Sequence, residues 1–354
     1  MKKIKVGVVG IGRIGRAHIA ELCAYSEMYE LIAVADHAPD RLENIPGLPE
    51  NTLKYSSLEE MLQNPELEMV TVCTRHPDHV PMSLKIMEAG KIAVDEKPVA
   101  TSVAEMELLR AALKKHPGKL FFRHNRTFEP AFMKAKQLLD SGLIGEVQYI
   151  KLYRSIGYCR RNDWLTMPEF YGGLLTNWGP HLIDQALRFL DAPVVDLWAD
   201  VRHVISIGDG DDMFKIIMKA ANGRVADVEV TGANAMPGRQ MEIIGSRGTL
   251  VHNGGPLLEV RHIDPAVELK PLKPHPENPP FQYGNFDETL YFVESKYEVS
   301  KEIGTMYFWK SIYDEIVNGI PSPVTFEHAA RVVQVTEDAF KKSGFEPIKK
   351  FFQK

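Results

Sequence analysis

Residues 4–15 read IKVGVVGIGRIG. An apolar run typical of a buried strand leads directly into a G-x-G-x-x-G motif, and an amphipathic stretch typical of a helix follows. In such a motif the first glycine allows a tight turn, the second lets the backbone approach a pyrophosphate, and the third allows close packing of the helix. The segment therefore predicts a dinucleotide-binding strand, turn and helix, with these residues at the cofactor: Gly10, Ile11, Gly12, Arg13, Ile14 and Gly15.

The next predicted strand ends at Asp36, 21 residues beyond Gly15. A carboxylate at this spacing accepts hydrogen bonds from the adenosine ribose hydroxyls and repels a 2′-phosphate. His37 follows it, where an arginine or a serine would accommodate a phosphate. We therefore expect NAD as the cofactor, with NADP as the alternative that Arg41, one turn further on, leaves open.

The first 125 residues alternate short apolar runs with amphipathic stretches, which is typical of a doubly wound parallel sheet. Strands are predicted at 4–9, 31–35, 69–73, 92–94 and 119–122. Helices are predicted between them at 14–25, 57–63, 79–89 and 102–115. We expect residues 1–125 to form a dinucleotide-binding domain of the Rossmann type.

Beyond residue 146 longer alternating segments predict strands at 146–155, 194–206, 213–220, 224–231, 239–245 and 249–252. The turn signals at 222–223 and 246–248 favour antiparallel pairing. Flanking helices are predicted at 129–141, 179–190, 304–318 and 326–342, and residues 264–300 are predicted to be a long surface excursion. Residues 126–354 are therefore expected to form a second α/β domain with a large open, mainly antiparallel sheet, whose C-terminal helix can pack back on the first domain.

Composition excludes several classes of protein. The 354 residues are 44% hydrophobic and carry a net charge of −5, with scattered lysines and arginines, so we expect neither a nucleic-acid nor a membrane partner. The three cysteines are far apart and form no C-x-x-C motif, which predicts no disulfide framework, no metal site and a reducing compartment. Because the N-terminal apolar run is broken by glycines, it does not resemble a signal peptide. We expect a cytoplasmic protein.

A second polar cluster follows the strand predicted at 92–94, where the chain reads Asp95-Glu96-Lys97-Pro98. Ligands gather at the carboxyl ends of the strands in open α/β sheets. A lysine there can hold its ammonium near a substrate oxygen, although a surface lysine beside a glutamate would be the ordinary interpretation of this tetrapeptide alone.

Together these residues resemble the Gfo/Idh/MocA oxidoreductases, a family that includes glucose–fructose oxidoreductase and inositol dehydrogenase. The resemblance covers nearly the whole chain. Four segments carry it: the glycine loop with Asp36, residues 74–79 (TRHPDH), residues 88–98 (EAGKIAVDEKP) and residues 172–184 (GGLLTNWGPHLID). It implies an NAD-dependent enzyme that moves a hydride between nicotinamide and a secondary alcohol carbon of a sugar, polyol or inositol-like substrate. It also implies that the second domain forms a homodimer or homotetramer through its open sheet.

The resemblance also assigns site residues. The family's catalytic lysine and histidine match Lys97 and His181, and we expect His181 to be the base, because imidazole titrates near neutral pH, and Lys97 to be the orienting cation. The further cofactor residues that the resemblance implies are Thr74, His76, His79, Glu96, Lys97 itself and Asn125. The substrate residues that it implies are Asn177, Tyr158, Asn162, Trp164 and Arg126. The family most often has an aspartate where this chain has Asn177, which cannot take a proton or raise the pKa of the histidine but can hydrogen-bond a substrate hydroxyl.

Two other functions stay open. An enzyme of this type can form a transient 3-keto sugar and then eliminate a neighbouring group, as a lyase or glycosidase that recycles its NAD. Some proteins of this fold bind a dinucleotide or a sugar as regulators without turnover. The pairing of Lys97 with His181 argues against the regulator.

Overall fold

The strand β1 (Ile4–Val9) lies near the centre of a six-stranded parallel sheet, and almost all its side chains are buried. The computed structural model describes residues 2–274, 276, 288–299 and 304–345. The strand order is β3-β2-β1-β4-β5-β6, the doubly wound order of dinucleotide-binding domains. The other strands are β2 (Tyr29–Ala35), β3 (Leu53–Tyr55), β4 (Met69–Val72), β5 (Ile92–Asp95) and β6 (Leu120–Phe122). The helices that connect them are α1 (Arg13–Ala24), α2 (Leu58–Leu62), α3 (His79–Glu88) and α4 (Val103–Lys115). The predicted parallel sheet is confirmed, and β3 is an addition to it.

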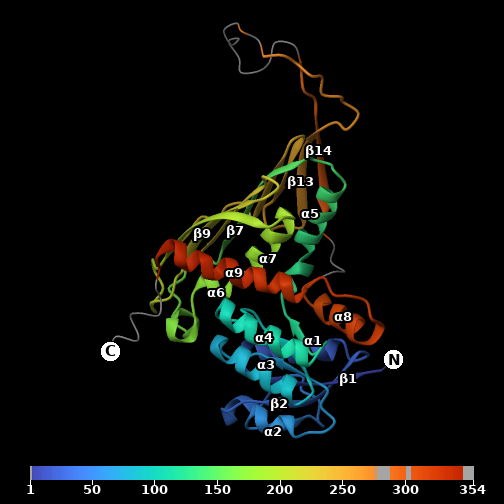
Figure 1. Cartoon of the computed structure of the whole chain (residues 1–354), viewed down its shortest axis with the longest axis vertical. Helices are drawn as coiled ribbons and strands as arrows, with labels where there is room; N and C mark the ends of the chain where they lie inside the picture. Colours follow the sequence, from blue (N-terminus) through green and yellow to red (C-terminus); the bar gives the residue numbers. More distant parts are fainter. Residues whose placement is uncertain (1, 275, 277–287, 300–303, 346–354) are drawn as a thin grey trace.

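A second sheet of eight strands has the order β14-β13-β12-β11-β7-β10-β9-β8. Only β7 and β10 pair in parallel; the other neighbours are antiparallel, as predicted. Its strands are β7 (Val147–Ser155), β8 (Val194–Arg202), β9 (Met213–Ala220), β10 (Val225–Thr231), β11 (Met241–Gly245), β12 (Gly248–His252), β13 (Leu257–Ile263) and β14 (Phe292–Glu298). Its helices are α5 (Pro130–Asp140), α6 (Leu174–Asn177), α7 (Gly179–Leu190) and α9 (Phe326–Ser343). In Figure 1, α9 crosses the middle of the molecule, and it packs on β8 and α7 of this half and on α4 of the other.

The helix α8 (Tyr307–Tyr313) continues into a π-helical turn over Asp314–Asn318. Although it follows the second sheet in the chain, its side chains complete the core of the first sheet. Trp309 is fully buried there, its indole N–H donates to Glu21 at 2.7 Å, and its carbonyl accepts from the Tyr29 hydroxyl at 2.6 Å. The return of the chain explains why the first core needs residues far beyond position 125. The domain boundary at that position stays a prediction.

The prediction for residues 264–300 is wrong in part. β13 and β14 form the outer ribbon of the second sheet, and β14 occupies residues 292–298. All its side chains are exposed or half-buried, so it lacks the apolar alternation by which strands are predicted. Residues 275, 277–287 and 300 of that stretch lie outside the described part of the chain.

The predicted strand 194–206 ends early, at Arg202. The Asp212 carboxylate accepts hydrogen bonds from the backbone N–H groups of residues 204, 205 and 206, and this turns the chain away from the sheet. In the part of the chain that the structure describes, no helix is both long and apolar enough to cross a membrane.

Trp309→Ala should lower the free energy of unfolding by about 3–5 kcal/mol, because it removes a fully buried indole from the first core. Chemical denaturation would measure the loss. Met306→Ala, at an exposed position of the same segment, is the control and should change stability by about 0.5 kcal/mol or less. Equal small effects of the two substitutions would contradict the role of α8 in the first core.

Candidate functional site

A cavity of about 550 Å³ lies at the carboxyl ends of β1, β2 and β4. Six residues predicted for the site line it: Gly10, Gly12, Arg13, Asp36, Thr74 and Trp164. All but Trp164 come from the first half of the chain. The cavity is therefore a groove of the Rossmann domain that one aromatic residue of the second half closes.

The three glycines of the loop have different surroundings. Gly10 has a φ of +88°, and a Cβ there would lie 2.7 Å from the Cys73 carbonyl. A Cβ at Gly15 would overlap the Gly10 carbonyl oxygen, whereas a Cβ at Gly12 would meet no atom within 4 Å. Gly10 and Gly15 thus permit the fold, and Gly12 leaves an open cradle on the cavity wall. Because α1 begins just after Gly12 with no acidic residue in its first turn, the cradle suits the phosphates of a dinucleotide.

Asp36 lines the same cavity beside the glycine loop and is buried. Its Oδ2 accepts from the Ile11 N–H at 2.7 Å and its Oδ1 accepts from the Ala38 N–H at 2.9 Å. Arg41 Nη1 lies 3.6 Å from Oδ2. The carboxylate therefore fixes the glycine loop, has remaining acceptor capacity for ribose hydroxyls, and has a guanidinium close by.

Glu96 is buried, and its Oε1 accepts from Arg123 at 2.6 Å and lies 2.8 Å from His18 Nε2. Its Oε2 accepts from the Lys97 N–H at 3.0 Å. Burial would raise the pKa of this carboxyl, but Arg123 and His18 outweigh it and hold the pKa well below the usual range. Arg123 also binds Glu21 at 2.5 Å. Glu96 is thus an ionised anchor inside the protein that orients the backbone of Lys97. The sequence did not predict Arg123 and His18 as partners of Glu96, although a buried glutamate requires a cation nearby.

Lys97 follows β5 of the first sheet and reaches across to the second half of the chain. Its ammonium donates to the Asn177 carbonyl at 2.7 Å and to Asn177 Oδ1 at 2.9 Å. Burial lowers the pKa of Lys97 to about 8 against the attraction of Glu96, and Arg126 and Arg13 lower it further. Within the described residues this ammonium has no ion-pair partner at bonding distance, so at neutral pH its charge is met by two neutral oxygens.

His181 lies in the first turn of α7, is buried, and has no hydrogen-bond partner at Nδ1 among the described residues. Burial lowers the pKa of His181 well below its ordinary value, and the charges of Lys97 and Arg126 lower it further. The imidazole is therefore neutral at physiological pH and has an unused nitrogen. The structure thus places Lys97 in contact with Asn177 and within electrostatic reach of His181; their catalytic roles stay predictions.

A cluster around the Trp178 ring adjoins this triad. The guanidinium carbons of Arg126 and Arg154 lie 4.8 Å and 5.4 Å from the ring centroid, and the ring meets His181 edge-on at 5.9 Å. Glu129 accepts from Arg126 at 2.8 Å and from Arg154 at 3.3 Å. We call these four residues the Trp178 cluster: Arg126, Glu129, Arg154 and Trp178. Of these, the sequence predicted only Arg126, because the contacts that Arg154 and Trp178 make with it span separations too long to leave a local signal.

His76 and His79 are buried, and their ring nitrogens face backbone oxygens. His76 Nδ1 lies 2.9 Å from the Tyr171 carbonyl, and its ring meets Trp164 edge-on at 5.0 Å. His79 Nδ1 lies 2.9 Å from the Pro98 carbonyl. Burial lowers the pKa of both imidazoles. These contacts hold the loop after β4 against the second half of the chain and against the residue that follows Lys97.

The remaining predicted residues have looser placements. Tyr158 is 65% exposed and Asn162 is also exposed, so neither reaches the buried triad as the chain stands. Asn125 begins a short 3-10 turn and is half-buried, as is Ile14 of α1. Their roles stay predictions.

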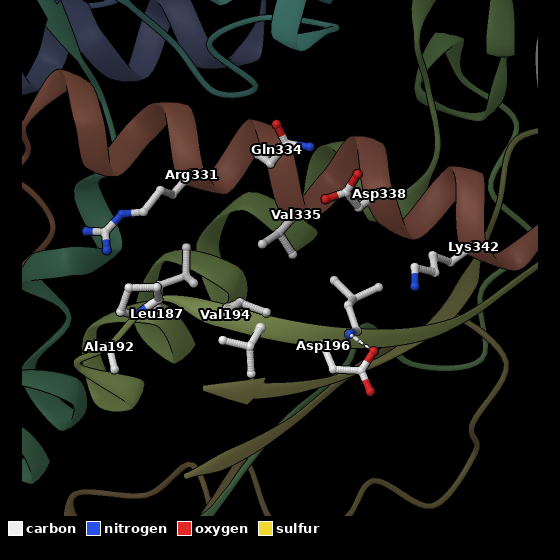
Figure 2. Close-up of a pocket in the computed structure, with 12 residues that line it drawn as sticks. Leu187, Ala192, Val194, Asp196, Arg331, Gln334, Val335, Asp338 and Lys342 are labelled. Atoms are coloured by element: carbon white, nitrogen blue, oxygen red, sulfur yellow. Dashed lines mark hydrogen bonds between the residues drawn. The ribbon is translucent and has the colours of Figure 1, made fainter. Parts of the chain in front are cut away.

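A smaller cavity, of about 320 Å³, lies between α9 and β8 (Figure 2). Leu187, Val194 and Val335 form an apolar wall, and charged residues of α9 form the rim. None of the residues predicted for the site lines it. Among the described residues, no group of three or more His, Cys, Asp or Glu side chains is arranged to hold a metal ion.

Comparison with known families matches both halves of the chain. Residues 4–124 match the family described as "Oxidoreductase family, NAD-binding Rossmann fold", and residues 132–251 match the "GFO/IDH/MocA C-terminal domain". The two matched segments contain Lys97 and the Asn177–His181 pair, respectively.

Relatives at low identity span most of the chain. The inositol 2-dehydrogenase of Rhizobium meliloti is 26% identical over 70% of this chain and 74% of its own. The scyllo-inositol 2-dehydrogenase (NADP(+)) IolW of Bacillus subtilis is 24% identical over 96% of this chain and 94% of its own. An NAD-binding protein from Listeria innocua shares the fold, with a TM-score of 0.82, 22% identity and coverage of 97% and 95%.

Gly12→Ala should leave folding nearly unchanged, because its Cβ meets no protein atom, yet it should weaken dinucleotide binding tenfold or more, about 1.4 kcal/mol. Calorimetric titration with NAD would measure the affinity, and thermal unfolding would measure stability. Gly15→Ala is the contrasting variant and should destabilise the fold. Wild-type affinity in Gly12→Ala would remove the cradle from the binding site.

Proposed function

Because the chain belongs to the Gfo/Idh/MocA family of oxidoreductases, we propose that it is an NAD-dependent dehydrogenase acting on a secondary alcohol of a sugar, polyol or inositol-like substrate. The observation that carries this proposal is that a buried ammonium, Lys97, and a buried neutral imidazole, His181, lie within electrostatic reach of each other, and that Arg13 on the dinucleotide cavity lies within reach of Lys97. Relatives named inositol dehydrogenases support the substrate class.

The two side chains have complementary roles. A bound NAD supplies the hydride acceptor. In the direction of oxidation, His181 takes the hydroxyl proton while the C–H bond breaks and the C–O bond becomes a carbonyl. The Lys97 ammonium, which already donates to oxygen atoms in this structure, stabilises negative charge on the substrate oxygen. Asn177 holds that ammonium in place and offers its amide to a substrate hydroxyl.

NAD is the proposed cofactor, since Asp36 would repel a 2′-phosphate. Arg41 at 3.6 Å from that carboxylate supports NADP as the second candidate, and the Bacillus subtilis relative is named an NADP(+) enzyme.

A cytoplasmic location is supported by three free cysteines. A homo-oligomer is supported by large apolar side chains exposed on the second sheet, such as Trp198 and Tyr149, which are 53% and 54% exposed.

The direct test is formation of reduced cofactor from NAD or NADP with a panel of inositols, aldoses, glycosides and sugar acids. Lys97→Met should lower kcat by roughly 10²–10³ while NAD affinity stays within a few-fold. Lys97→Arg retains the charge and should be less impaired. Substrate cleavage without net reduced cofactor would favour the lyase or glycosidase, and binding without any turnover would favour the regulator.

The pH dependence of kcat/KM shows whether Lys97 acts as a cation or as the catalytic base. The pKa of Lys97 is lowered to about 8. If Lys97 acts as a cation, kcat/KM for oxidation should fall as pH rises through 8. If Lys97 acts as the base, kcat/KM should rise over the same pH range. The acid limb, from His181, should lie well below pH 6.5 because its pKa is depressed.

Asn177→Asp sharpens this test. The new carboxylate would lie beside the Lys97 ammonium, favour its charged form and move the alkaline limb up by about 1 pH unit. It would favour protonated His181 in the same way and raise the acid limb. An unmoved profile in Asn177→Asp would contradict the assignment of these limbs.

A further inference from the structure

The positive charge at the site exceeds the negative charge. Lys97 has only the neutral oxygens of Asn177 as hydrogen-bond partners in the described chain. Glu96 is engaged by Arg123 and His18. The two guanidinium groups of the Trp178 cluster share the one carboxylate of Glu129. The cluster thus has a surplus of one positive charge, whereas the charge of Lys97 is offset by the one negative charge that Glu96 and Glu21 leave after pairing with Arg123.

Catalysis would increase this surplus. His181 would become an imidazolium as it takes the hydroxyl proton, in contact with Trp178 and under the field of Lys97 and Arg126. The like charges of Lys97 and Arg126 raise the free energy of the protonated imidazole. A negative charge on the substrate would offset that rise at the moment it occurs, so it would stabilise the transition state as well as the bound complex.

Arg126 is the group best placed to bind such a charge. Its guanidinium is held by Trp178 on one face and by Glu129 through Nη1, and its side chain is 25% exposed. No other N–H of this guanidinium is bonded within the described residues. A fixed planar fork with free N–H groups matches a planar carboxylate. One negative charge would also balance the single surplus charge of the cluster, whereas a phosphate dianion would exceed it.

We propose that the substrate is a sugar acid, a polyhydroxy carboxylate whose carboxylate binds Arg126 while its secondary hydroxyl lies at Lys97 and His181. This inference rests on the proposed function and names its substrate class. Arg126 is then the residue that selects acids over neutral polyols, and Trp178 is a positioning residue that fixes the guanidinium beside His181.

Binding to the NAD-loaded protein tests the inference without requiring turnover. The probes are D-gluconate and D-glucuronate, their neutral counterparts sorbitol and D-glucose, and D-glucose 6-phosphate, each titrated by calorimetry. We expect at least one of the two acids to bind tenfold or more tightly than its neutral counterpart. Arg126→Gln should abolish that preference, Arg126→Lys should retain part of it, and binding of the acid should weaken as salt rises.

Arg110→Gln is the matched control, because it removes the same charge at a site paired with Glu107 and Glu327 on the surface. It should retain the preference, and thermal unfolding should show that the variants are folded. Equal binding of acids and neutral sugars, a preference that survives Arg126→Gln, or tighter binding of the phosphate ester would overturn the inference. Acids that bind through Arg126 but form no reduced cofactor would instead count against the proposed dehydrogenase while the inference stands.

Discussion

The hydrogen bonds from the Lys97 ammonium to Asn177 join the two halves of the molecule at the point where chemistry is proposed. Lys97 is oriented from behind by Glu96, which Arg123 and His18 keep ionised. Asn177 ends α6, and His181 follows one turn later in α7. A cation from one domain and a neutral imidazole from the other therefore meet only if both domains are folded and docked, and α8 and α9 hold them together by packing across the boundary.

Burial is the physical cause of the division of roles. It depresses the pKa of Lys97 only to about 8, so the side chain is still mainly charged at neutral pH, while it depresses the pKa of His181 well below the usual range, so the imidazole is free to accept a proton. A donor and an acceptor thus coexist over a window between the two pKa values. The neutral Asn177 keeps this window at neutral pH, because a carboxylate in its place would raise both pKa values and move the window to higher pH.

Local sequence patterns predicted most of this architecture. The glycine loop and Asp36 predicted the cavity because turn chemistry and strand ends are local features. The parallel, doubly wound character of the first sheet followed from strands alternating with helices, although β3 was not predicted. β14 was not predicted, since its pairing is long-range and its side chains are exposed. In the site, Lys97 and His181 came from a family resemblance, whereas Trp178, Arg154 and Glu129 came only from the structure. Trp178 and Arg154 are distant in sequence from Arg126, and residues that pack together over such distances share no regular spacing.

The most direct test of the account is a crystal structure of the protein with NADH and a bound polyol or sugar acid. The account predicts one substrate hydroxyl within hydrogen-bonding distance of both Lys97 Nζ and the His181 ring, with the nicotinamide ring against the same carbon. A structure in which Lys97 stays bonded to Asn177 alone, and no substrate hydroxyl reaches His181, would contradict it.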